Sequence, residues 1–366
     1  MRPDGIVMRE VAMTPLRVGI LGATGLVGQR LVERLASHPW FRVTTLAASD
    51  RSAGLPYKGA AAWRLSGRVP DYAAEAIVRR CAVPEFGECD VVLSALDAAV
   101  AREVEPRFAE AGFAVISNSS AFRQDDAVPL LVPEVNPDHL GVIETARRRG
   151  AGFIVTNPNC STTGLAVALA PLHRAFGLRR VLVATMQAVS GAGVEGPRAL
   201  DVLDNVIPHI PGEEEKIETE LGKILGDFDG ARLRRADFAV SAHCHRVPTL
   251  DGHLEAVSIG LERKATASEI GDALRSFRSA AEPDRLPSAC GPPIVVREEV
   301  DRPQPRLDRD CGGGMTVVVG RIRPCNVLDF RLLVLSHNTV RGAAGGTLLN
   351  AELLAARGLL ARRSPA

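Results

Sequence analysis

The chain has 366 residues, more than the about 250 to 300 residues that one hydrophobic core usually holds, so two structural units are expected. Apolar residues make up 46% and charged residues 24%, which is typical of a globular protein and excludes a disordered or fibrous chain. The 44 Lys and Arg balance 43 Asp and Glu, and this net charge of +1 argues against nucleic acid or a membrane surface as a partner.

The amino-terminal part alternates strands and helices, a pattern typical of a doubly wound α/β domain. Residues 1–14 are expected to be a leader outside the fold. A glycine-rich turn and a helix over 26–36 follow the first strand, and a crossover helix is predicted over 99–111. The predicted strands are 17–21, 42–48, 90–95, 113–117 and 153–156. We therefore expect a Rossmann-type, dinucleotide-binding domain over residues 15–157.

The remaining part has longer strands and predicts a second domain, α+β with a mixed sheet, over residues 158–336. Its predicted strands are 180–189, 237–244, 255–261, 316–322 and 330–336. The segment 284–311 holds five prolines and is expected to be an irregular excursion over the surface. In the last segment, 337–366, a helix over 343–357 is expected to return to the first domain.

The glycine-rich turn predicts a phosphate site. Gly22, Gly25 and Gly28 follow a strand and open a helix, where bare N–H groups and the helix dipole bind a pyrophosphate, although the same spacing also suits a merely structural turn. The second strand ends in SDRS, 49–52, where such folds contact the ribose 2′ position. Arg51 between serines favours NADP, whereas Asp50 leaves NAD open. The predicted cofactor contacts are Gly22, Thr24, Gly25, Leu26, Val27, Ser49, Arg51 and Ser52.

Cys160 is the candidate nucleophile. The seven cysteines form no CxxC pair and are expected to be reduced, as in cytosol. Asn159 can cap the following helix, which places Cys160 in its first turn, where the dipole stabilises a thiolate. The alternative is a small buried apolar residue, as expected for the other six. A nucleophilic thiol beside a nicotinamide would bind an aldehyde and pass through a thioester, with His253 as a plausible base.

A metal site is not expected. His243, His245 and His253 are close in sequence, but two histidines at i and i+2 on a strand need a third ligand at suitable spacing.

The chain resembles the aspartate-β-semialdehyde dehydrogenases, and within them the archaeal and fungal branch, from about residue 16 to residue 354. The resemblance depends on the order and spacing of many segments rather than on one motif. These segments are 22–28 (GATGLVG), 49–54 (SDRSAG), 117–123 (SNSSAFR), 132–140 (VPEVNPDHL), 156–162 (TNPNCST), 187–193 (QAVSGAG), 204–216 (DNVIPHIPGEEEK), 246–255 and 336–346 (SHNTVRGAAGG).

The resemblance implies a role for each matching residue. Cys160 corresponds to the acylated nucleophile, His253 to the acid/base and Gln187 to a residue that positions substrate and nucleophile. The implied substrate contacts are Arg246 for the carboxylate, Glu213 for the ammonium, Lys216 and Arg123 for the phosphate, and Asn118 close by. Asn338 would reach the cofactor near its nicotinamide.

The resemblance also implies the reaction: NADPH-dependent, reversible reduction of L-4-aspartyl phosphate to L-aspartate 4-semialdehyde and phosphate, for lysine, threonine and methionine synthesis. A cytoplasmic homodimer or homotetramer is expected, with the second domain pairing the subunits. Two alternatives stay open. One is malonyl-CoA reduction on the same scaffold, and the other is an NADP-binding protein without catalytic activity.

Overall fold

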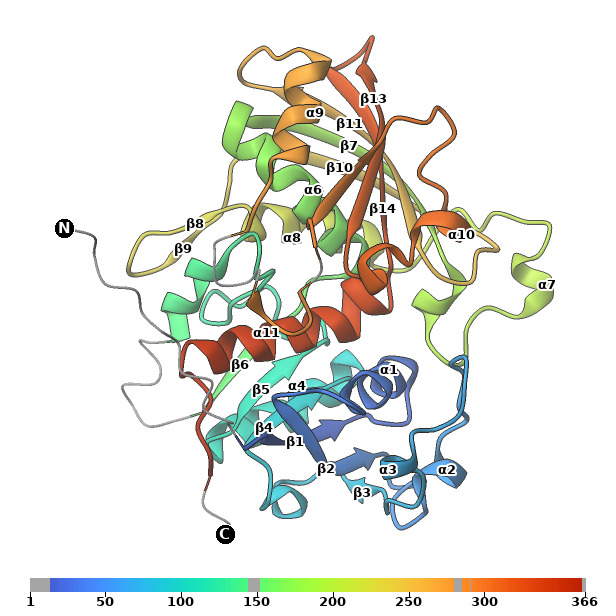
Figure 1. Cartoon of the computed structure of the whole chain (residues 1–366), viewed down its shortest axis with the longest axis vertical. Coiled ribbons are helices and arrows are strands. Elements are labelled where there is room, and N and C mark those ends of the chain that lie inside the picture. The colour runs from blue at the N-terminus through green and yellow to red at the C-terminus, as the bar shows by residue number, and fades with distance from the viewer. Residues whose placement is uncertain (1–13, 144–151, 280–284, 290, 364–366) are drawn as a thin grey trace.

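A computed structural model describes residues 14–143, 152–279, 285–289 and 291–363, and nearly all of the predicted leader, residues 1–13, lies outside these ranges. Figure 1 shows two sheets stacked along the long axis of the molecule, each with its own helices. Each sheet has six strands. This arrangement confirms the expected fold class, a Rossmann-type half followed by an α+β half with a mixed sheet.

The first sheet is parallel throughout and has the strand order β3-β2-β1-β4-β5-β6. Its buried apolar runs explain why helices cover both faces. The strands are β1 (Leu16–Leu21), β2 (Phe41–Ala48), β3 (Arg79–Arg80), β4 (Val91–Ser94), β5 (Ala114–Ser117) and β6 (Phe153–Thr156), and the main helices are α1 (Leu26–Leu35) and α4 (Ala98–Glu110). The strand order reverses between β1 and β4, and ligands of such sheets bind at the carboxyl ends of the strands beside this point.

The second sheet is mixed, with the order β10-β7-β11-β14-β13-β12. Its strands are β7 (Leu178–Gln187), β10 (Ala239–Arg246), β11 (His253–Leu261), β12 (Ile294–Arg297), β13 (Val317–Pro324) and β14 (Phe330–Ser336). Helices α6 (Cys160–Phe176), α8 (Glu213–Ile224) and α9 (Ala267–Arg275) cover one face and share its apolar core. The other face stays open, and Leu182 on it is 44% exposed.

Strand β12 corrects one expectation. The proline-rich segment 284–311 was expected to be irregular, but its residues 294–297 pair in parallel with β13 and complete the edge of the second sheet. The strand was missed because it is only four residues long and directly follows Pro292 and Pro293. The short helix α10 (Pro305–Asp308) also lies in this segment, and residues 284 and 290 lie outside the described ranges.

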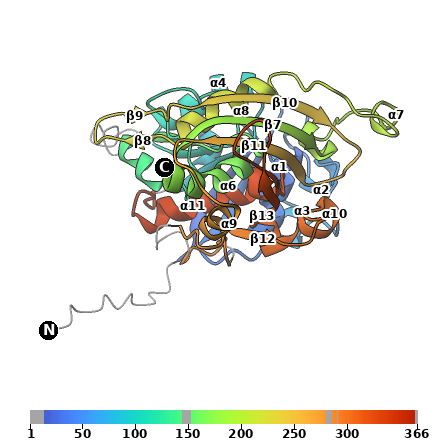
Figure 2. The same ribbon diagram turned by 90° about the horizontal axis from the view of Figure 1, so that it is seen from above.

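The last helix, α11 (Gly345–Ala356), crosses back between the two halves (Figure 1). Its Leu348, Leu349 and Leu353 belong to the apolar core of the parallel sheet. A π-helical turn, η6 (Val340–Ala344), lies between the end of β14 and the start of α11. Figures 1 and 2 both show the short helix α7 (Ala199–Val202) on a loop that projects from the body. None of the described helices is long and apolar enough to cross a membrane.

Candidate active site

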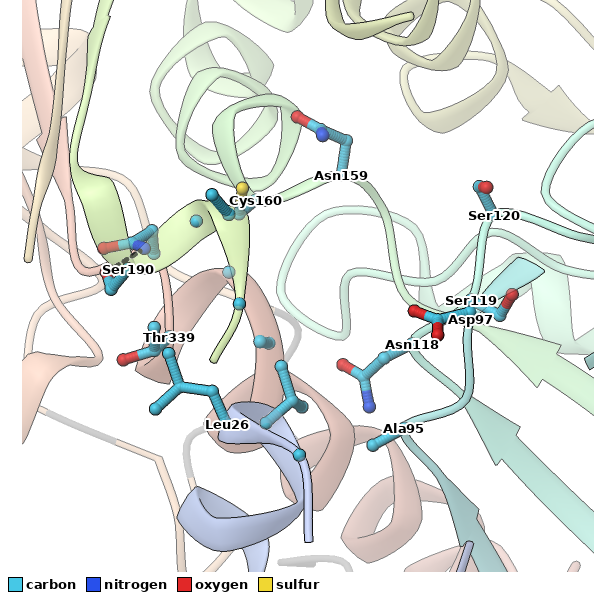
Figure 3. Close-up of a pocket in the computed structure, with 18 of the residues that line it drawn as sticks. Leu26, Ala95, Asp97, Asn118, Ser119, Ser120, Asn159, Cys160, Ser190 and Thr339 are labelled. Atoms are coloured by element: carbon cyan, nitrogen blue, oxygen red, sulfur yellow. Dashed lines mark hydrogen bonds between the residues drawn. The ribbon is translucent and has the colours of Figure 1, made fainter. Parts of the chain in front are cut away.

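A cavity of about 570 Å³ lies between the two halves, at the carboxyl ends of the parallel strands. Figure 3 shows Leu26 of α1 on one side of it, Asn118 beyond the end of β5 on another, and Cys160 at the start of α6 on a third. The segments that follow β1, β4 and β5 therefore meet residues of the second half at the switch point of the first sheet.

Cys160 is the first residue of α6, and the cap predicted for this helix is present. The Asn159 side chain accepts hydrogen bonds from the backbone N–H groups of Ser161 and Thr162. This cap satisfies two N–H groups that the first helical turn cannot satisfy itself. Sγ of Cys160 lies 3.2 Å from Nε2 of His253, so the predicted nucleophile and acid/base are in direct contact.

Strand pairing brings three of the predicted residues to one edge of the second sheet. Gln187 ends β7 and pairs with Arg246, which ends the parallel strand β10. His253 begins β11, which runs antiparallel to β7 with Leu254 opposite Met186. All three side chains are buried on the face that α6 covers, because alternate residues of a strand share a face. The sheet thus places a carboxamide, a guanidinium and an imidazole around the start of α6.

One backbone group determines which nitrogen of His253 carries the proton. The N–H of Ala188 donates to Nδ1 at 3.0 Å, so Nδ1 offers a lone pair and the proton of the neutral ring is on Nε2. Nε2–H therefore donates toward Sγ of Cys160. A second proton on this ring would require Nδ1 to give up its bond to Ala188.

Burial keeps both members of this pair neutral. It raises the pKa of the Cys160 thiol to about 12, and the nearby Glu213 carboxylate adds to the rise. It also lowers the pKa of His253 to about 3, with Arg246 as the next cause. Cys160 therefore lies at the predicted helix start, but burial opposes the thiolate that the helix terminus would favour.

Glu213 and Lys216 lie on one face of α8, as their spacing predicts, and they bind each other. Nζ of Lys216 donates to Oε1 of Glu213 at 2.7 Å. Oε2 of Glu213 accepts from the side chains of Asn159 at 2.8 Å and Gln187 at 3.3 Å. The Lys216 ammonium and these hydrogen bonds hold the pKa of the Glu213 carboxyl below its usual value despite its burial. Glu213 is thus a charged acceptor in the cavity wall.

Arg123 reaches the cavity from the loop after β5. Its Nη1 donates to Glu220 at 2.9 Å and its Nη2 to the backbone oxygen of Asn118 at 2.8 Å. The Asn118 side chain also lines the cavity, but it is tied to neighbours, since Oδ1 accepts from Asn157 and Thr347 and Nδ2 donates to Ser94. Asn118 therefore supports the wall more than it offers free groups to a ligand.

Arg246 lies behind the turn at Gly191, which forms part of the cavity wall. Its Nη1 donates to the backbone oxygen of Ala188 at 2.8 Å. A Cβ on Gly191 would lie 2.8 Å from Nη1 and 3.2 Å from Cε1 of His253, so a larger residue at this position in the turn η3 (Val189–Ala192) would push the Arg246 guanidinium aside. Gly191 lines the cavity, so the Arg246 guanidinium lies directly behind the cavity wall.

The glycine-rich loop has the geometry of a phosphate cradle. Gly22 adopts a φ of 73°, and its Cβ would lie 2.5 Å from the backbone oxygen of Ala95. A Cβ on Gly28 would lie 2.2 Å from the backbone oxygen of Gly22, so α1 packs directly against the turn. Gly25, Leu26 and Val27 line the cavity at the amino end of α1. These features fit a dinucleotide pyrophosphate.

The other predicted cofactor contacts lie around this cradle. The Thr24 carbonyl accepts from the buried Gln29 side chain, which also fixes the backbone of Arg64. Ser49, Arg51 and Ser52 follow β2, the strand next to β1, and Arg51 is exposed there. Asn338 lines the cavity on the opposite side, where Nδ2 donates to Oγ of Ser190 at 2.8 Å, the dashed contact in Figure 3.

The candidate metal cluster does not assemble among the described residues, in which no group of three suitable ligands is found. The reason is strand alternation. His243 and His245 point to the open face of the second sheet, whereas His253 points to the covered face, beside Cys160.

Comparison with known proteins agrees with this arrangement. Residues 17–143 match the family model of the semialdehyde dehydrogenase NAD-binding domain, and residues 169–341 match that of the semialdehyde dehydrogenase dimerisation domain. The aspartate-semialdehyde dehydrogenase of Archaeoglobus fulgidus is 52% identical over 339 residues, which span 92% of this chain and 97% of that protein. The chain belongs to the aspartate-semialdehyde dehydrogenase family. The aspartate-semialdehyde dehydrogenase of Saccharomyces cerevisiae is 44% identical, and the match covers 93% of this chain and 98% of that protein.

Two solved aspartate-semialdehyde dehydrogenases show the same fold. The crystal structure from Candida albicans, determined with NADP, superposes with a TM-score of 0.88 at 42% identity and covers 95% of this chain and 100% of that chain. Aspartate semialdehyde dehydrogenase II of Vibrio cholerae, complexed with ASA, gives 0.74 at 29% identity and covers 94% and 99%. The predicted resemblance to this family is thereby confirmed.

Some residues of this aspartate-semialdehyde dehydrogenase site were missed by sequence reasoning. Ser190 binds Asn338, and Glu220 binds Arg123. Glu220 had a detectable signal, because it follows Glu213 by seven residues and Lys216 by four on one helix and therefore shares their face. Ser190 had none, since its partner is 148 positions away in the chain.

Proposed function

We propose that the chain catalyses the reversible, NADP-dependent conversion of L-aspartate 4-semialdehyde and phosphate into L-4-aspartyl phosphate. The observation that carries this proposal is the contact of 3.2 Å between Sγ of Cys160 and Nε2 of His253 in a cavity that the phosphate cradle also lines. A thiol that can be acylated and a dinucleotide site in one cavity suit an aldehyde oxidation that passes through a thioester.

The charged residues around this pair suit an amino acid that carries an acyl phosphate. Lys216 and Arg123 line the cavity and are proposed to bind the phosphate. Glu213, a charged acceptor beside them, suits the ammonium, and Arg246 can bind the carboxylate in bidentate fashion behind Gly191. Gln187 is proposed to hold Glu213 in place through their 3.3 Å contact.

The chain's own groups account for the acyl transfer. As Sγ attacks the acyl carbon, the carbon–oxygen bond to phosphate breaks, and the thiol proton can leave on the released hydrogen phosphate. Nε2–H of His253, 3.2 Å from Sγ, stabilises negative charge on sulfur and on the adjacent oxygen. When NADPH is bound, it supplies hydride to the thioester carbon. Collapse then breaks the carbon–sulfur bond, and the sulfur, held beside Nε2–H of His253, takes a proton from water that replaces the one that left on phosphate.

The cofactor site supports NADP. Gly22 and Gly28 allow the tight turn that brings the start of α1, with Gly25 in the cavity wall, into position for a pyrophosphate. The exposed Arg51 between two serines suits a 2′-phosphate better than a hydroxyl. Asn338 is proposed to contact the nicotinamide end, because it binds Ser190, which lies near Cys160 in Figure 3.

We further propose that the protein is a cytoplasmic homodimer, or a pair of such dimers, that works in lysine, threonine and methionine synthesis. The uncovered face of the second sheet presents Leu182, Ala256 and Leu333 around a hollow of about 460 Å³, a suitable surface for a second copy. The match to a dimerisation domain over the same sheet supports this interface. The six described cysteines are free thiols, as expected in a reducing compartment.

One assay tests the proposed activity. Purified protein is mixed with aspartate semialdehyde and phosphate, and reduction of NADP or NAD is followed by absorbance, while malonyl-CoA with NADPH is tested in parallel. Phosphate-dependent reduction of NADP is expected. Turnover of malonyl-CoA alone, or no turnover with any substrate, would refute the proposal. Cys160→Ala should abolish turnover and keep NADPH binding, and a substantial residual rate in this variant would remove Cys160 from its role.

A further inference from the structure

Glu220 is a buried carboxylate that contacts two parts of the active site at once. It lies on α8 and is 1% exposed. Its Oε1 accepts from Nη1 of Arg123 at 2.9 Å, and its Oε2 accepts from the backbone N–H of Asn159 at 2.7 Å. One carboxylate therefore binds Arg123 of the cavity wall with one oxygen and Asn159, the residue immediately before Cys160, with the other.

The rest of the same helix face strengthens this arrangement. Lys223, one turn further along α8, donates to the backbone oxygens of Arg123, Asp125 and Val128, so the loop that carries Arg123 is tied to α8 at two levels. At the other end of α8, Glu213 binds the side chain of Asn159. The segment before Cys160 is thus also held twice, by Glu213 through a side chain and by Glu220 through the backbone.

We propose that Glu220 is a positioning residue that couples the phosphate subsite to the nucleophile. This inference rests on the proposed function, because it takes Arg123 as a phosphate ligand. Through Oε1, Glu220 fixes the direction of the Arg123 guanidinium. Through Oε2, it fixes the backbone at Asn159, which determines the position of Sγ of Cys160 in the cavity. An anion that draws Arg123 toward itself pulls on the carboxylate that holds Asn159, so phosphate binding is transmitted to the cysteine.

Glu220→Gln tests this role with little change in volume. The amide keeps one acceptor oxygen and presents NH₂ groups in place of the other, so one of the two contacts must be lost. We expect the KM for phosphate to rise and kcat/KM to fall by about 10- to 100-fold, since a displacement of about 1 Å is enough for such a loss. Alkylation of Cys160 by iodoacetamide, measured without substrates, should change as well, whereas NADP binding should not.

Glu218→Gln is the matched control. Glu218 lies on the same helix and its carboxylate accepts one backbone N–H, that of Ala242, without touching a residue of the site. This variant should keep the wild-type KM for phosphate and the wild-type alkylation rate. If Glu220→Gln behaves like Glu218→Gln, or loses activity only in proportion to the fraction that unfolds, the positioning role is refuted. A wild-type protein without phosphate-dependent turnover would instead refute the proposed function.

A double variant separates the two contacts and guards against misfolding. Arg123→Gln with Glu220→Leu removes both charges of the buried pair, so it leaves no unpaired charge inside the protein, and because leucine has no acceptor it also removes the contact to the Asn159 N–H. Its KM for phosphate should equal that of Arg123→Gln alone, because the Oε1 contact is already lost. Its Cys160 alkylation rate should still differ from that of Arg123→Gln, because the Oε2 contact to Asn159 is lost only in the double variant. Equal alkylation rates would overturn the coupling to the nucleophile.

Discussion

The backbone N–H of Ala188 donates to Nδ1 of His253 at 3.0 Å, on the side of the ring away from Cys160. A main-chain group therefore sets the tautomer of the imidazole beside Cys160, where many enzymes use a carboxylate for a catalytic histidine. A carboxylate at Nδ1 would favour a doubly protonated ring, but an N–H donor opposes it. The geometry favours a neutral imidazole that acts as a hydrogen-bond donor toward sulfur.

Nitrogen NMR of the histidine side chains tests this tautomer. In protein labelled with ¹⁵N-histidine, Nε2 of His253 should show a bound proton and Nδ1 should not, through neutral pH and well into the acid range, because the pKa of His253 is lowered to about 3. The signals are assigned by their loss in His253→Gln. A proton on Nδ1 at neutral pH would contradict the Ala188 contact.

The same burial predicts a loss of stability in acid. The pKa of His253 is about 3 in the folded protein and near its usual 6.5 in the unfolded chain, so the folded state binds this proton less readily. Its contribution to the free energy of unfolding is present above pH 6.5 and falls by about 1.4 kcal/mol for each pH unit from there toward pH 3. Urea unfolding at several pH values should show a flatter acid limb for His253→Gln. The exposed His209→Gln is the control and should follow the wild type; parallel curves for all three would exclude the effect.

Gly342 should not tolerate a methyl group. Its Cβ would lie 2.7 Å from Cα and 2.9 Å from the backbone oxygen of Cys160, and backbone atoms at a helix start cannot move aside cheaply. Gly342→Ala should lower the free energy of unfolding by about 1–3 kcal/mol and reduce kcat more than NADP affinity. Thermal unfolding and steady-state kinetics measure both. Gly59→Ala in helix α2 (Tyr57–Ala60) has no atom within 4 Å of the added Cβ and should be neutral. Full activity in Gly342→Ala would show that η6 can shift away from Cys160.

Arg51 should decide between the two nicotinamide cofactors. If its guanidinium binds the 2′-phosphate, Arg51→Ala should raise the KM for NADP about tenfold, the value of one hydrogen bond to a charged group. The KM for NAD should hardly change, since NAD has no such phosphate. Arg42→Ala, an exposed arginine at the other end of β2, is the control. An equal rise for both cofactors would place Arg51 outside the 2′ site.

The sequence predicted most of the fold, because its strands are apolar runs with clear boundaries. The predicted parallel strands differ from the observed ones by at most one residue at each end, as with 90–95 against Val91–Ser94. The four-residue strand β12 was missed, since pairing with β13 and not its own sequence makes it a strand.

The site was predictable where a residue's role depends on its chemistry and its own helix or strand. Cys160, His253 and the Glu213–Lys216 pair were found in this way. Two properties were not, because they depend on distant parts of the chain. Burial of Cys160 by several segments reverses the expected direction of its pKa, and the partner of Glu220 is 97 residues away.

The two cations that are proposed to bind phosphate already hold a carboxylate, Lys216 that of Glu213 and Arg123 that of Glu220. A phosphate bound by these cations would therefore share them with the Glu213 and Glu220 carboxylates or displace those carboxylates, because neither cation is unpaired beforehand. Paired charges of opposite sign nearly cancel at a distance and attract little beyond a Debye length of about 8 Å. If the two cations bind phosphate as proposed, they select it by contact rather than by long-range attraction, and they take back their carboxylate partners when it leaves, as a reversible reaction requires.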